Sequence, residues 1–162
     1  MTPITYSLEH ANATVYLSLT DQRFIARTQG KGLLDKPRTI DISLSDLKNF
    51  CLVPTIAAQN LVGQNESDYS YDSEFIFSYD DNGKLNKKRV FVNSRDEAFR
   101  KFLEALARAC PAASLLHLEP AEAQRQIGVI NARKTVYIII GLIVGVPIII
   151  ALIVIISKIL GG

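Results

Sequence analysis

The sequence lacks the short motifs that mark common classes of enzyme. It contains no GxSxG nucleophile elbow, no Walker phosphate-binding loop, no Rossmann glycine pattern and no HExxH zinc motif. Its two histidines, His10 and His117, belong to no recognisable set of ligands or catalytic partners. We therefore expect a protein that is not an enzyme, with no catalytic residues, no metal and no cofactor.

Cysteine is scarce as well, with Cys51 and Cys110 as the only two in the chain. Neither belongs to a CxxC pair, and both lie in apolar stretches, "NFCLV" and "LARACP". A disulfide or a thiolate metal site is therefore not expected. The sequence predicts that both cysteines are buried as small apolar side chains.

Charge is absent from one long stretch. Residues 135–156, 22 in all, contain no Asp, Glu, Lys or Arg, and fifteen of the nineteen residues from 138 to 156 are Ile, Leu or Val. A helix of this length spans about 33 Å, and the hydrocarbon core of a bilayer is about 30 Å thick. Because a buried helix in a soluble domain keeps a polar side, this run predicts a single transmembrane helix.

The flanks of this run predict its orientation. Arg125, Arg133 and Lys134 precede it and only Lys158 follows it, so the positive-inside rule places the N-terminal side in the cytoplasm. The first residues do not resemble a signal peptide. We expect a tail-anchored, single-pass membrane protein, with a soluble domain at 1–118, a linker at 119–134, the transmembrane helix at 135–156 and a short tail at 157–162.

Two glycines inside the run, Gly141 and Gly145, form a GxxxG pattern. Small residues four positions apart allow two transmembrane helices to approach closely. They are therefore candidates for a helix-dimerisation contact, and chance occurrence of the pattern is the alternative.

Charge is balanced but segregated in the N-terminal part. Residues 1–118 hold fourteen Lys or Arg and fourteen Asp or Glu, yet residues 66–81 carry six acids and no base, whereas residues 23–38 carry five bases and one acid. Zero net charge does not favour nucleic acid as a partner.

Alternation of apolar and polar residues predicts about seven strands. The runs are 13–19, 23–28, 38–44, 49–53, one short strand within 55–73, and 75–79 and 89–92 around an Asn-Gly turn. One amphipathic helix at about 95–110 follows, with Ser94 and Glu97 as an expected capping box and Pro111 as its end. Residues 120–133 could hold a further short helix that Gly128 interrupts.

Two motifs resemble those of a known family. "LTDQRFIAR" followed by "IDISLSDLKNF" is similar to the paired signature of bacterial pleckstrin-homology-like (PH-like) domains, which are related to the GRAM domain. The resemblance covers roughly residues 4–118. It implies an α+β fold in which a bent antiparallel sheet of about seven strands is capped by one C-terminal amphipathic helix.

The segment "KGLLDKPR" is similar to the loop with which lipid-binding members of that family hold inositol phosphates. Lys31, Lys36 and Arg38 are therefore candidates for binding an anionic lipid head group, and an ordinary solvated loop is the alternative. Three functions follow for the chain. The first is an adaptor whose domain binds a protein partner or forms a homo-oligomer, the second is a lipid-binding protein, and the third is a small accessory subunit of a larger membrane complex.

Overall fold

The computed structural model describes residues 3–10, 13–32, 35–55 and 71–129. Residues 1–127 form one compact unit, and residues 128–162 form a second. No helix in the described ranges is long and apolar enough to cross a membrane. The run 135–156, the tail 157–162 and the glycines Gly141 and Gly145 lie outside these ranges.

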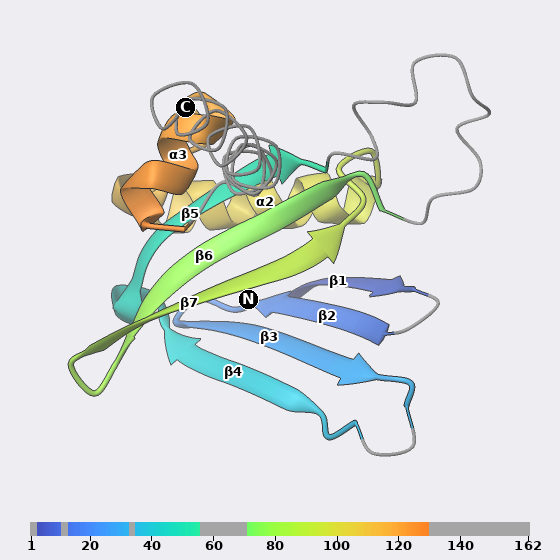
Figure 1. The fold of residues 1–162 in the computed structure, drawn as a ribbon. Helices are drawn as coiled ribbons and strands as arrows, with labels where there is room; N and C mark the ends of the chain where they lie inside the picture. The colour runs from blue at the N-terminus through green and yellow to red at the C-terminus, as the bar shows by residue number, and fades with distance from the viewer. Residues whose placement is uncertain (1–2, 11–12, 33–34, 56–70, 130–162) are drawn as a thin grey trace, which may run out of the picture. The chain divides into compact units, whose positions relative to one another are not determined.

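In the described residues, seven strands form two antiparallel sheets (Figure 1), so the expected α+β class is confirmed. The first sheet has the order β1-β2-β3-β4, and the second has the order β5-β6-β7. The strands are β1 (Ile4–Glu9), β2 (Ala13–Leu19), β3 (Arg23–Gly30), β4 (Arg38–Ser43), β5 (Leu47–Pro54), β6 (Ser73–Asp81) and β7 (Lys84–Val92). Two sheets replace the expected single bent sheet because a short 3-10 helix, Leu44–Asp46, separates β4 from β5.

The observed strands differ from the expected ones at two places. Strand β1 was not among the expected strands, although it pairs with β2 along its whole length. The short strand expected within 55–73 falls mainly on residues 56–70, which lie outside the described residues.

The two-residue turn between β6 and β7 consists of Asn82 and Gly83, both with positive φ (54° and 83°). This is the backbone that Asn-Gly favours.

Helix α2 (Glu97–Ala109) begins later than expected. Asp96 is its N-cap, with a carboxylate oxygen that accepts a hydrogen bond of 2.7 Å from the Ala98 amide. Ser94 instead donates to Asp72 from both its amide (2.7 Å) and its hydroxyl (2.8 Å). The predicted capping box of Ser94 and Glu97 is therefore wrong, because Asp96 is closer to the first helical turn and Ser94 ties that turn to the start of β6.

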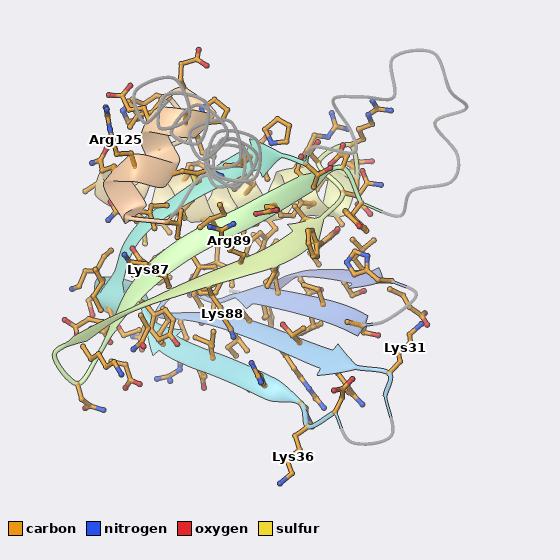
Figure 2. All side chains as sticks on the ribbon, in the orientation of Figure 1. Lys31, Lys36, Lys87, Lys88, Arg89 and Arg125 are labelled. Atoms are coloured by element: carbon orange, nitrogen blue, oxygen red, sulfur yellow. The ribbon has the colours of Figure 1, made fainter. Side chains whose placement is uncertain are left out.

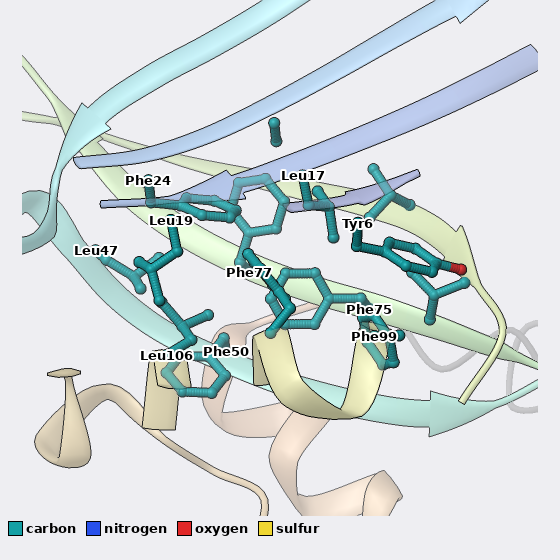
Figure 3. Packing of buried hydrophobic residues seen from close by; sticks show 14 of the residues in the cluster. Tyr6, Leu17, Leu19, Phe24, Leu47, Phe50, Phe75, Phe77, Phe99 and Leu106 are labelled. Atoms are coloured by element: carbon teal, nitrogen blue, oxygen red, sulfur yellow. The ribbon is translucent and has the colours of Figure 1, made fainter. Parts of the chain in front are cut away.

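The main core lies between the two sheets and α2 (Figure 3). Helix α2 packs against β1 and β2, and its buried side is Phe99, Phe102 and Leu106. The Phe102 ring lies 6.1 Å from Phe24 of β3 and 6.2 Å from Phe75 of β6, centroid to centroid. One α-helical face thus joins both sheets through aromatic contacts.

Tyr6 of β1 connects this core to the strand end that precedes α2. Its hydroxyl oxygen accepts a hydrogen bond of 2.9 Å from the Asn93 amide. Burial raises the pKa of Tyr6 to about 12. The hydroxyl is therefore un-ionised at neutral pH and remains a stable hydrogen-bonding group.

A second helix, α3 (Pro120–Ile127), lies within the segment expected to be a linker. It packs against β5 and β6 and buries Ala123, Gln124 and Ile127, so the compact unit extends beyond residue 118. Helix α3 ends before Gly128, which has a φ of 74°. The further short helix considered within 120–133, with its interruption at Gly128, is thus present, but it packs on the folded unit, for which one C-terminal helix was expected.

The cysteines differ in burial. Cys51 of β5 is 1 % exposed, and burial raises the pKa of its thiol to about 11, so the predicted burial is confirmed for it. Cys110 is only half-buried, and its Sγ lies 3.8 Å from the Leu44 carbonyl oxygen. Both thiols are free, as expected for an apolar rather than a cross-linking role.

We predict that Phe102→Ala lowers the free energy of unfolding by about 3–5 kcal/mol, because it empties a fully buried site between α2 and both sheets. Pulse proteolysis in urea measures this change in the full chain. The matched control is Arg100→Ala, an exposed position on the same helix, which should change stability by less than about 0.5 kcal/mol. Equal unfolding midpoints for both variants would contradict the assigned core.

Candidate functional site

A basic groove of about 560 Å³ lies between the end of the first sheet and strand β7. Four cationic residues and one acid line it, together with small or uncharged residues of β2 and β3. The lining residues are Ala13, Thr28, Gly30, Asp35, Lys36, Arg38, Lys88 and Arg89. Figure 2 shows Lys36 extending from the β3–β4 loop and Lys88 from β7.

Strand periodicity directs two of these cations into the groove. Lys88 shares a face of β7 with Val90 and Val92, which are buried in the core. Arg38 likewise shares a face of β4 with Ile42, which is buried. At this end of the sheets the inward face therefore carries cations instead of apolar side chains, and both of these residues still reach solvent.

The β3–β4 loop is shaped by Asp35. Its carboxylate accepts a hydrogen bond of 3.1 Å from the Gly32 amide, and its own amide donates to the Gly32 carbonyl oxygen at 3.1 Å. A Cβ atom at Gly30 or Gly32 would collide with this carboxylate. The two glycines of "GKG" thus allow the acid to fold back on the loop, which positions Lys36 and Arg38 beside it.

The structure brings together two of the three predicted site residues. Lys36 and Arg38 line the groove, whereas the Lys31 ammonium lies 2.7 Å from the Glu9 carboxylate and Lys31 is not among the lining residues. The hydrogen bond from Lys31 lowers the pKa of Glu9. Within the described ranges, Lys36 and Arg38 form no ion pair.

Strand β7 supplies two cations, Lys88 and Arg89, that were not predicted to belong to the site. Lys88 makes no ion pair with any residue the structure describes, and the Arg89 guanidinium lies 3.6 Å from the Glu74 carboxylate. The signal for Lys88 is its position in "KKRVFV", where alternation with Val90 and Val92 assigns it to the inward face. Its proximity to the β3–β4 loop depends on the packing of the sheets and has no local signal.

The family-like motif "LTDQRFIAR" has a structural role at the other end of β3. Arg23 donates to the Asp41 carboxylate at 2.7 Å and to the Asp41 carbonyl oxygen at 3.3 Å, which ties β3 to β4. The Thr20 hydroxyl accepts from the Arg23 amide at 3.1 Å. These contacts fix the β2–β3 turn and the register of the first sheet, away from the groove.

An aromatic cluster lies at the far end of β7. The imidazole of His10 contacts the rings of Tyr71 and Phe91, with centroid distances of 4.9 and 6.1 Å. Burial lowers the pKa of His10, a backbone hydrogen bond to Phe91 opposes this, and the charge of Lys31 lowers it further. Phe91 remains 44 % exposed, so this end of β7 presents an apolar side chain to solvent.

No protein-family model matches the chain, and no curated protein matches its sequence. Within the described ranges, no group of three or more His, Cys, Asp or Glu residues could hold a metal ion. The chemistry that the groove itself offers is recognition of anionic groups by Lys and Arg.

We predict that the chain loses stability as the pH falls below about 6.5, partly through His10. The folded pKa of His10 is lower than the unfolded one, so the unfolded chain binds this proton first. The loss begins near the unfolded pKa and ends below the folded pKa. Unfolding midpoints are measured between about pH 7.5 and about pH 5, the range in which histidine titrates. The midpoint of His10→Gln should fall less with decreasing pH than the midpoint of the unmodified chain. The exposed His117→Gln is the control, and an identical decline in all three chains would contradict the role of His10.

Proposed function

We propose that the chain is a non-enzymatic membrane adaptor. A PH-like domain on the cytoplasmic side binds a protein partner, and residues 135–156 hold this domain at the membrane. The observation that carries the proposal is the combination, in one chain, of a compact folded unit at 1–127 and an uncharged apolar run of 22 residues outside it. Such a run is long enough to span a bilayer.

The order of the elements supports a PH-like domain. Four antiparallel strands, then three, are followed by α2, which packs on the first sheet and closes the core. The resemblance of "LTDQRFIAR" and "IDISLSDLKNF" to that family implies such an order, and the two segments form the adjoining parts of β2–β3 and β4–β5. An adaptor function is consistent with a rigid core of this kind that leaves loops and sheet edges accessible.

We predict that the folded unit faces the cytoplasm, because three cations precede the apolar run and one follows it. Protease added to sealed vesicles with the cytoplasmic side outward should digest residues 1–127. The apolar run should stay with the membrane after an alkaline wash. Full protection of the folded unit would show the opposite orientation, and release of the intact chain by alkali would show that it does not span the membrane.

The basic groove favours a second function, binding of an anionic lipid head group. Lys36, Arg38 and Lys88 lie within one groove, and each cation close to an anionic surface contributes about 1 kcal/mol. A domain held at the membrane would need only weak attraction to be oriented by this contact. In this arrangement Lys31, which binds Glu9, contributes less than Lys88.

We predict that a fragment of residues 1–129 binds vesicles containing phosphatidylserine weakly and that added salt weakens this binding further, because surface electrostatics decay over about 8 Å at physiological salt. The triple variant Lys36→Ala, Arg38→Ala, Lys88→Ala should lose the binding in a sedimentation assay. Lys48→Ala, Lys101→Ala, Arg108→Ala removes the same charge elsewhere and is the control. Equal loss in both variants would indicate a general charge effect, and no binding at low salt would exclude the lipid function.

A further inference from the structure

Strand β7 is an edge strand of the second sheet in the described residues. In the part of the chain that the structure describes, β7 pairs with β6 on one side and with no strand on the other. The turn Asn82-Gly83 makes Asp81 and Lys84 the first hydrogen-bonded pair of this hairpin. Every second residue from Lys84 therefore directs its backbone groups to β6. The backbone groups of the residues between them, at 85, 87, 89 and 91, face the outer edge.

The side chains of these same four residues form a patterned row. They are Leu85, Lys87, Arg89 and Phe91, all exposed on the outward face of the strand, with Leu85 53 % and Phe91 44 % exposed. The row reads apolar, basic, basic, apolar. A strand added to this edge would place one of its own side chains opposite each of them, with Cβ atoms about 5 Å apart.

The basic groove lies beside the middle of this edge. Arg89 lines it together with Lys88, and Lys36 and Arg38 lie across it on the first sheet. An extended segment paired with β7 would therefore pass cations on both sides. Acidic side chains opposite Lys87 and Arg89 would lie on the outward face beside these two cations. The cations of the inward face would add a longer-range attraction for a negatively charged segment.

The same cations oppose the most obvious competing occupant, a second copy of β7. Two antiparallel β7 strands centred on residue 88 would place Lys87 of one copy opposite Arg89 of the other. Like charges directly opposite each other destabilise strand pairing. Charged residues on an edge strand, and an inward-facing one such as Lys88, are also the usual protection against unspecific pairing.

From these observations we infer that β7 binds an extended acidic segment of a partner protein by β-augmentation. The segment has acidic residues at two alternate positions, with an apolar residue two positions further out on each side, to match the row from Leu85 to Phe91. This pattern reads the same in both directions. The inference rests on the proposed adaptor function, since that function supplies the partner, and it assigns the surface and the chemistry of recognition.

The test uses the full chain in dodecyl maltoside micelles and a fluorescein-labelled peptide, TVTETDTVT. This peptide carries the expected pattern on one face and threonine on the other. Fluorescence anisotropy should show binding that weakens with salt. Two control peptides, TVTKTKTVT with reversed charge and TVEDTTTVT with its two acids on opposite faces of the strand, should bind at least about tenfold more weakly, because neither can form both cross-strand charge pairs. Two results would overturn the inference. One is no binding up to about 1 mM, which corresponds to a binding free energy of about −4 kcal/mol. The other is equal binding of all three peptides.

Reversing the charges of Lys87 and Arg89 tests whether these two residues determine which peptide binds. Lys87→Glu, Arg89→Glu should lose affinity for TVTETDTVT by at least about tenfold and gain affinity for TVTKTKTVT. Lys101→Glu, Arg108→Glu makes the same change of charge on the exposed side of α2 and is the matched control. An equal loss of affinity in both variants would reduce the effect to net charge and overturn the assignment to β7.

Two N-methylated peptides test β-augmentation in the unmodified chain and do not depend on the folding of any variant. One carries N-methyl groups on its valine and acidic residues, and the other carries them on the threonines between these. In a strand pair only one of these two sets of amides faces β7, so one peptide should lose binding and the other should keep it. Loss or retention by both would overturn strand pairing.

Hydrogen exchange gives a second readout of the site. The amides of residues 85, 87, 89 and 91 should become protected when TVTETDTVT binds, and unchanged exchange there would overturn the inference. A membrane partner could co-purify equally with the unmodified chain and with the Lys87→Glu, Arg89→Glu chain. This result would support the adaptor function and would exclude β7 as the surface that binds the partner. Failure of the adaptor function itself would instead appear as a chain that never enters the membrane in the alkaline-wash experiment.

Discussion

The burial of one side of α2 between the sheets is the contact on which the other features depend. Phe99, Phe102 and Leu106 are fully buried, and the ring of Phe102 touches residues of both sheets. Two sheets that share few hydrogen bonds need such a shared apolar element to form one core. Since α2 packs on β1 and β2, it closes the side of the core next to those strands. The side between β4 and β7, both edge strands, is where the basic groove lies.

The connections around α2 keep this helix in place. Asp72 accepts two hydrogen bonds from Ser94, Tyr6 accepts one from the Asn93 amide, and Asp96 caps the first turn. Each bond joins segments that are remote in sequence or fixes the last residues before the helix. Together they hold the end of β7, the start of β6 and strand β1 at one point. The conformation of β7 is thereby coupled to the core, although one of its edges faces the groove.

Local patterns determined most of what could be predicted about the fold. Alternation identified β2, β3 and β6, the Asn-Gly pair identified the tightest turn, and the apolar stripe identified α2. Strand β1 was not predicted, although Ile4, Tyr6 and Leu8 alternate with polar residues as in the other strands, and only Tyr6 of these is fully buried. The N-cap was misplaced because Ser94 and Asp96 are both good capping residues, and only the contact with Asp72, 22 positions away in the sequence, decides between them.

The candidate site was harder to predict, for a physical reason. Lys36 and Arg38 stand in an obviously basic loop, but the choice between them and Lys31 depends on Glu9, which reaches Lys31 only through the pairing of β1, β2 and β3. Lys88 joins them from a strand 50 residues later in the sequence (88 minus 38). Such proximity is set by the packing of the two sheets, which no local pattern encodes.

The inward-facing cations also follow from the physics of the core. A lysine or arginine at the rim of a core can cover apolar surface with its methylene groups and keep its charge in water. Lys88 and Arg38 occupy such positions. Lys88 lies two residues before the buried Val90 on the same face of β7, and Arg38 lies four residues before the buried Ile42 on the same face of β4. An apolar residue at either position would extend the core to an open edge and favour unspecific strand pairing. The charges therefore limit the core and protect the edge, and at the same time they give the groove its basic character.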